Sequence, residues 1–130
     1  MDSLTAHYLA RELDARWCGR RVAGFEVDRE RRAVALLVAG GQAVEIDLSA
    51  PEVRVYERPQ PPPRGALDGW SVTAVTAPVD DRRMTIHFEK PGKFRGSPSR
   101  HATLEVSMVP TARGAALRGE GNRVLASVGA

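Results

Sequence analysis

Cysteine is almost absent from this sequence, and its scarcity excludes two kinds of site. Cys18 is the single cysteine, so an internal disulfide cannot form and no cysteine-based metal cluster is expected. The opening segment, residues 1–17, alternates charged and apolar residues at helical spacing, which is unlike a secretory signal. Together these features predict a cytoplasmic protein.

Long hydrophobic runs are absent as well. The longest run, residues 33–41, is far shorter than the ~20 residues that a helix needs to cross a bilayer, so we expect no membrane partner. The 130 residues are 42% hydrophobic and 27% charged, which is ordinary for a globular protein. A chain of this length predicts one domain, residues 1–130, with a modest core.

Lysine is also scarce. Lys90 and Lys93 are the only lysines among 19 cationic residues, and the rest are arginines. The planar guanidinium group of arginine suits phosphate and stacks on bases, although a GC-rich genome produces the same bias. The net charge of +3 therefore permits an acidic polymer as a partner without requiring one.

Catalytic patterns are missing from the sequence. His7, His87 and His101 stand far apart, without the spacing of a triad or of metal ligands. Cys18 follows a predicted helix C-terminus, where the helix dipole does not favour a thiolate. No glycine-rich phosphate loop joins a strand to a helix. We therefore expect a protein that is not an enzyme and needs no cofactor.

The first 19 residues predict a helix. Asp2 or Ser3 can cap its amino terminus, and Gly19 can adopt the left-handed conformation that ends a helix. Apolar residues recur at spacings of three and four, which predicts one buried stripe: Ala6, Leu9, Ala10, Leu13 and Trp17.

From residue 20 the period changes to two, which predicts a β-meander over residues 20–58. Its expected strands are residues 22–27, 33–38, 44–48 and 53–56, with a charged turn at 28–32 and a hairpin turn at Gly40-Gly41. Residues 59–69 contain four prolines, cannot join a ladder or a helix, and predict a stiff crossover.

Residues 70–130 predict further strands and a closing hairpin. The expected strands are 70–76, 84–88, 102–108, 115–118 and 123–127. The charged turn Asp80-Asp81-Arg82-Arg83 leads directly into strand 84–88. In that strand the apolar and polar positions alternate, with Met84, Ile86 and Phe88 on one face and Thr85, His87 and Glu89 on the other. A half-buried strand holds the preceding turn rigidly.

A second basic segment follows, residues 90–101, in which cations surround the aromatic residue Phe94. Arginine and lysine with an interleaved aromatic residue are typical of phosphate contact combined with base stacking. If the sheet brings its strand ends together, this segment, the Asp80–Arg83 turn and Arg20-Arg21 share one face. Taken alone, the turn is better explained as a solvated cap on a strand.

An ordered series of short segments resembles the NFACT family of ribosome-associated quality-control proteins, also called fibronectin-binding protein A homologues. The likeness is to their NFACT-N domain and extends over nearly the whole chain. The segments are residues 1–5, 11–13, 19–22, 46–49, 54–56, 59–63, 81–83 and 104–108, followed by the closing hairpin.

The resemblance implies a fold, a partner and a site. The fold is α+β, with the N-terminal helix packed on an antiparallel β-sandwich or partly open barrel, similar to the N-terminal domain of formamidopyrimidine-type DNA glycosylases. The partners it implies are tRNA and the large ribosomal subunit. An adjacent Asp-Arg pair engages tRNA in the family, and it matches Asp81 and Arg82 here. Glycosylase chemistry uses a proline after the initiating methionine, where this chain has Asp2.

We therefore expect a non-catalytic RNA-binding domain. Asp81 and Arg82 would position tRNA, while Arg83, Lys93 and Arg95 would contact phosphate. Two alternatives stay open: a protein–protein interaction module that uses the proline run or a sheet edge, and a catalytically inactive, glycosylase-like DNA-binding domain.

Overall fold

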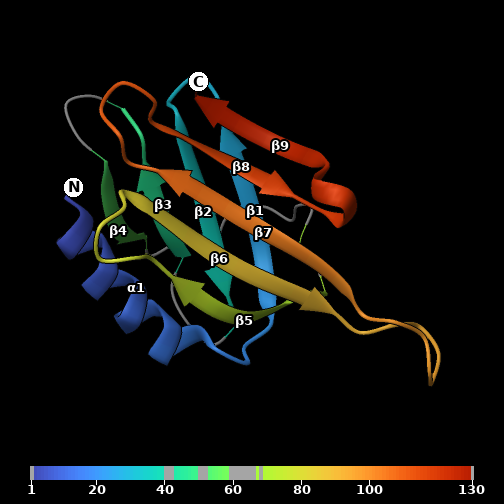
Figure 1. Ribbon diagram of the computed structural model, residues 1–130. Helices are drawn as coiled ribbons and strands as arrows, with labels where there is room; N and C mark the ends of the chain where they lie inside the picture. The colour runs from blue at the N-terminus through green and yellow to red at the C-terminus, as the bar shows by residue number, and fades with distance from the viewer. Residues whose placement is uncertain (1, 40–42, 50–52, 59–66, 68, 130) are drawn as a thin grey trace.

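The protein is one helix and two antiparallel sheets (Figure 1). The computed structural model describes residues 2–39, 43–49, 53–58, 67 and 69–129. The expected α+β class with an N-terminal helix is confirmed. The Gly40-Gly41 turn and nearly all of the crossover at 59–69 lie outside the described residues.

Helix α1 (Ser3–Trp17) begins and ends where the sequence predicts. The Asp2 side chain caps it by accepting a hydrogen bond from the Thr5 N–H at 2.7 Å. Cys18 is the C-cap, and Gly19 follows with a φ of +86°, a conformation that glycine adopts without strain. The stripe at Ala6, Ala10, Leu13 and Trp17 is buried, so amphipathic spacing fixes how this helix packs.

The first sheet has the strand order β1-β2-β3-β4, a simple meander. Its strands are β1 (Val22–Asp28), β2 (Ala33–Val38), β3 (Ala43–Asp47) and β4 (Arg54–Arg58). The charged turn between β1 and β2 is stabilised by the Asp28 carboxylate, which accepts a hydrogen bond from the Arg31 N–H at 3.0 Å. All four predicted strands are therefore present, with ends shifted by at most two residues.

The second sheet has the order β5-β6-β7-β8-β9 and is also a meander. Its strands are β5 (Ser71–Thr76), β6 (Arg83–Lys90), β7 (Arg100–Ser107), β8 (Gly114–Arg118) and β9 (Val124–Gly129). A short 3-10 turn, η1 (Glu120–Asn122), joins the last two. On β6, Met84, Ile86 and Phe88 are at most 1% exposed, so the predicted alternation is confirmed.

The core lies between the two sheets, whose inward side chains form one cluster together with α1. Each fully buried Leu, Ile, Met or Phe side chain in it contributes about 1.5–3 kcal/mol. β1 and β9 approach each other at one side, where the Arg29 Nε donates to the Ser127 carbonyl at 3.3 Å. On the other side α1 lies against β5 (Figure 1). The two sheets thus enclose one core, with β1 near β9 on one side and α1 on the other.

Helix α1 also covers the outer edge of β5. The Cys18 thiol donates to the Thr73 carbonyl at 3.1 Å, Asp14 accepts from the Val75 N–H at 2.8 Å, and His7 Nδ1 lies 2.6 Å from the Ala77 carbonyl. The backbone of residues 19–22 pairs with Trp70 and Val72 farther along the same edge. An edge strand with unpaired backbone groups invites non-native pairing, and these contacts remove that hazard.

In the described part of the chain, no helix is long and apolar enough to cross a membrane. The same part contains no cluster of three or more His, Cys, Asp or Glu side chains suited to a metal ion.

Candidate nucleic-acid interface

The three residues Asp81, Arg82 and Arg83, hereafter the entry cluster, lie where the chain enters β6. The Asp81 N–H bonds the Pro78 carbonyl at 3.5 Å, and the Arg82 carbonyl accepts from the Met108 N–H at 2.8 Å. Arg83 is the first residue of β6 and pairs with Ser107 of β7. The backbone of this turn is therefore held by the sheet. The Arg82 and Arg83 side chains are exposed, while that of Asp81 is half-buried.

Asp81 and Arg83 line a groove on the outer face of the β5–β9 sheet, hereafter the outer groove. This sheet lies in front of β1–β4 in Figure 1. The residues that line this groove include small and hydroxyl-bearing ones: Thr76, Thr85, Ser107, Gly114, Ala116 and Ser127. His87 lies among them, with its Nε2 3.2 Å from the Thr76 hydroxyl. Such a floor offers hydrogen-bonding groups to a polar ligand, and the Glu105 and Arg118 side chains, an ion pair at 3.4 Å, line the same groove.

Arg82 lies closer to α1. The pKa of the Asp2 carboxyl is lowered, mainly by the hydrogen bond from the Thr5 N–H, and the charge of Arg82 contributes to the same shift. The loop before β6 runs beside the first turns of α1 in Figure 1, which agrees with this proximity. Asp81 therefore lines the outer groove, while the exposed Arg82 lies near enough to the amino-terminal end of α1 for its charge to act on Asp2.

Lys93, Phe94 and Arg95, hereafter the hairpin cluster, occupy the tip of the loop between β6 and β7. This loop projects well beyond the two sheets (Figure 1). Lys93 and Arg95 are exposed, and Phe94 is 77% exposed. The expected exposed aromatic residue among cations is therefore present.

The structure places the entry cluster and the hairpin cluster at opposite ends of β6, so they do not lie side by side as expected. Arg83 and Lys90 are the two ends of β6, so at about 3.3 Å per residue they lie about 23 Å apart. Arg21 bridges to Ser71, which pairs with Glu89, so Arg20-Arg21 lies at the hairpin end. The sequence already held this signal, because the two clusters flank the same predicted strand.

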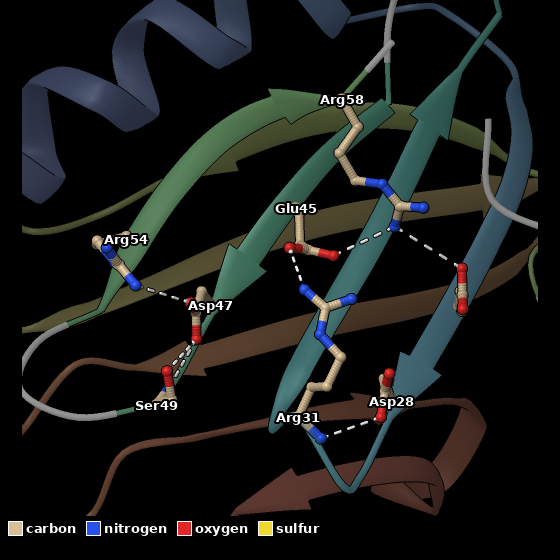
Figure 2. A network of polar contacts seen from close by, with 8 residues as sticks. Asp28, Arg31, Glu45, Asp47, Ser49, Arg54 and Arg58 are labelled. Carbon is tan, nitrogen blue, oxygen red and sulfur yellow. Dashed lines mark hydrogen bonds and ion pairs between the residues drawn. The ribbon is translucent and has the colours of Figure 1, made fainter. Parts of the chain in front are cut away.

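A charge network that sequence reasoning missed lies on the other sheet (Figure 2). Glu45 on β3 is only 3% exposed, although its position in the alternation predicts an outward, solvated side chain. Its two carboxylate oxygens bind Arg58 Nη1 at 3.2 Å and Arg31 Nη2 at 3.1 Å. The Glu26 carboxylate lies 3.8 Å from the same Arg58 nitrogen, within ion-pair range but too far for a hydrogen bond.

The sequence feature that could have indicated this network is a set of alanines on two neighbouring strands. Ala33, Ala35 and Ala43 occupy neighbouring buried positions on β2 and β3, and Ala35 pairs directly with Glu45. Small side chains leave room for long arginines to lie over the sheet and cover the carboxylate. Since Arg31 and Arg58 are engaged by carboxylates, they are poor candidates for phosphate contacts.

Comparison with known proteins identifies the fold. The structure is similar to the N-terminal domain of fibronectin-binding protein PavA from Streptococcus pneumoniae, with a TM-score of 0.71 and 14% identity over 97% of this chain and 52% of that one. It is also similar to the fibrinogen-binding protein from Staphylococcus aureus, with a TM-score of 0.76 and 14% identity over 97% of this chain and 49% of that one.

These likenesses are consistent with the fold that the NFACT resemblance implies. No protein-family model matches the sequence, and no curated protein matches it. At 14% identity the two solved structures establish the fold alone, and this chain spans about half the length of each.

Proposed function

We propose that this protein is a non-catalytic RNA-binding domain whose ligand is tRNA, as the NFACT resemblance implies. The observation that carries the proposal is the position of the entry cluster: a rigid turn presents Asp81 and Arg83 to the outer groove and leaves Arg82 exposed beside it. Rigid presentation matters because it lowers the entropic cost of ordering a contact on binding.

The charges of the entry cluster support this assignment. Among the described residues, ion pairs engage Arg16, Arg31, Arg54, Arg58 and Arg118, but neither Arg82 nor Arg83. Both guanidinium groups are exposed and can bind phosphate in bidentate fashion. Asp81, which cannot bind phosphate, would accept hydrogen bonds from ribose hydroxyls or base amino groups.

The test is a gel-shift assay with tRNA and the double variant D81A/R82A. We expect it to abolish tRNA retention. The thermal midpoint should hardly change, because the bond that fixes this turn uses the Arg82 carbonyl, which alanine keeps. The charge-neutral double variant R11A/E12A is a matched control, since it removes an adjacent exposed Arg–acid pair from α1. Undiminished tRNA binding by D81A/R82A would reject the site.

A second candidate function is a protein-interaction module. The exposed apolar side chains of Leu4 and Tyr8 on α1, 52% and 59% exposed, favour it. So do the names of the two similar proteins, which refer to fibronectin and fibrinogen binding. Salt titration separates the candidates, because phosphate contacts weaken steeply with ionic strength and an apolar surface hardly responds.

The third candidate is a catalytically inactive DNA-binding domain, which the expected likeness to formamidopyrimidine-type glycosylases suggests. Competition of duplex DNA against tRNA tests it. Duplex DNA would displace tRNA from a DNA-binding domain. On the tRNA proposal the protein works in the cytoplasm, at the large ribosomal subunit. Co-purification of that subunit with the protein from its host tests this part.

A further inference from the structure

The loop that carries the hairpin cluster is built as a compact turn. The Ser97 N–H donates to the Phe94 carbonyl at 2.9 Å, and Gly96 between them has a φ of +86°. A Cβ on Gly92 would lie 2.5 Å from the Ser97 Cβ and 2.7 Å from its carbonyl oxygen, so only glycine allows the two arms to touch. The tip is therefore held in shape, and it holds Phe94 away from the core.

Phe94 is the most exposed of the large apolar side chains in the described residues, at 77%; the next is Tyr8, at 59%. An isolated aromatic ring at the tip of a shaped turn contributes nothing to the core. Lys93 and Arg95 flank it directly, and residues 90–100 include no acidic residue. Arg100 lies over the Trp70 ring, 5.9 Å from its centroid, and fixes the base of the hairpin instead.

One ring with a cation on each side matches the chemistry of one unpaired nucleotide. The ring stacks on the base, and the two cations contact the phosphates on either side of it. A base inside a duplex is stacked on its neighbours and cannot accept the ring. A bilayer is the other surface that takes up an aromatic residue among cations, but a single ring anchors a protein to it weakly.

The distance between the two clusters sets the size of the ligand. The entry cluster lies at the other end of β6, a strand about 23 Å long, so the two clusters are separated by more than the length of this strand. Between them the outer face of the sheet carries hydroxyl and small side chains along part of its length. A folded RNA with a paired stem and an unpaired segment can contact both clusters at once, the stem at one and the unpaired segment at the other.

We propose that the β6–β7 hairpin is a separate subsite for an unpaired nucleotide, in which Phe94 stacks on the base while Lys93 and Arg95 hold the flanking phosphates. This inference rests on the proposed RNA-binding function and makes it specific. The entry cluster contacts the paired stem, and the hairpin reads the loop or the single-stranded end.

The test measures fluorescence anisotropy with three RNAs: a blunt duplex, a stem–loop with the same stem, and a single strand of about six nucleotides. The wild-type protein should bind the stem–loop most tightly. F94A should bind the stem–loop about tenfold more weakly and the duplex unchanged, because only stacking is lost. F94W should restore the preference, and its indole fluorescence should be quenched when the stem–loop binds.

The control Y8A removes an exposed aromatic ring from α1 and should bind all three RNAs as the wild type does. If F94A binds the stem–loop as tightly as the wild type, or loses duplex and stem–loop equally, the subsite is rejected while RNA binding stands. If the wild type binds none of the RNAs, the proposed function fails and the subsite with it. Vesicle binding that depends on Phe94, with RNA binding unchanged in F94A, assigns the hairpin to a membrane and also overturns the proposal.

Discussion

The Asp14 carboxylate on α1 accepts a hydrogen bond from the backbone N–H of Val75 on β5, at 2.8 Å. The helix side chain here supplies the hydrogen-bond acceptor that a neighbouring strand would otherwise provide to β5. Cys18 and His7 do the same for the carbonyls of Thr73 and Ala77. The helix therefore stabilises the sheet through backbone hydrogen bonds as well as through its buried stripe.

Removing the Asp14 carboxylate should destabilise the protein. D14A leaves the half-buried Val75 N–H without its partner, and we expect the free energy of unfolding to fall by about 1–2 kcal/mol in urea denaturation. D14N keeps an acceptor oxygen and should recover most of the loss. Faster hydrogen exchange at the Val75 amide in D14A alone would confirm the cause. Equal stability of D14A and the wild type would show that water replaces the carboxylate without cost.

Much of the fold could be predicted from the sequence because its signals are local. The apolar stripe from Ala6 to Trp17 predicted the helix. The strict alternation at Met84, Ile86 and Phe88 predicted which face of β6 is buried. The contacts of His7, Asp14 and Cys18 could not be predicted, since they depend on which strand lies at the sheet edge. That is a property of strand order, which no local pattern encodes.

The candidate site was predicted less completely. The exposure of Phe94, Arg82 and Arg83 followed from the predicted loop and turn, although Arg83 is the first residue of β6 in the structure. Alternation shows which face a side chain takes but not which end of the sheet it occupies, so one shared face was expected where the structure has two clusters. The burial of Glu45 was not predicted, because long arginine side chains from β4 and the β1–β2 turn cover it. The alternation of apolar and polar residues along a strand does not show how far side chains from other elements extend.

The Glu45 network should stabilise the first sheet (Figure 2). E45A leaves Arg31 and Arg58 facing each other without their common carboxylate. Both arginines are partly exposed, so the loss should be smaller than for a fully buried pair, about 2 kcal/mol in chemical denaturation. E57A breaks the Arg16–Glu57 pair, in which both side chains are nearly half-exposed, and should cost less than about 0.5 kcal/mol. Similar losses in the two variants would contradict this distinction.

The Asp47 carboxyl should make the free energy of unfolding depend on pH in the acidic range. Hydrogen bonds from the Ser49 side chain and backbone, with a smaller effect of Arg54, hold the pKa of its carboxyl below the ordinary 3.8. A lowered folded-state pKa stabilises the protein above pH 3.8, and this stabilisation is lost as the pH falls through the folded-state value.

Substituting Asp47 tests this linkage. D47N should be less stable than the wild type at neutral pH, and the difference should shrink in acid. Urea midpoints measured from about pH 2.5 to 7 would show the convergence. A difference that stays constant over this range would mean that Asp47 acts through packing rather than through its charge.

Substitution of Gly92 should change the shape of the β6–β7 hairpin and the RNA binding that depends on it, and leave the rest of the protein unchanged. In G92A the new Cβ collides with Ser97 and its backbone, so the tip must rearrange and Phe94 loses its position. We expect G92A to reduce stem–loop RNA affinity as much as F94A does, with duplex affinity unchanged. G19A is the control, because Gly19, like Gly92, lies in a connection next to a strand, but a Cβ there meets no atom within 4 Å. Its positive φ makes alanine costly to stability, and RNA affinity should nevertheless stay at the wild-type value.

The two clusters should be separable by the salt dependence of binding. Each phosphate contact that is lost lowers the slope of log affinity against log salt concentration by about 1. R83A should lower the slope for both the duplex and the stem–loop, because the entry cluster contacts the stem. K93A/R95A should lower it only for the stem–loop. R11A changes the net charge as R83A does, but from α1, and should leave both slopes unchanged. If R11A lowers them equally, the protein attracts RNA through its net charge alone, and neither cluster is a site.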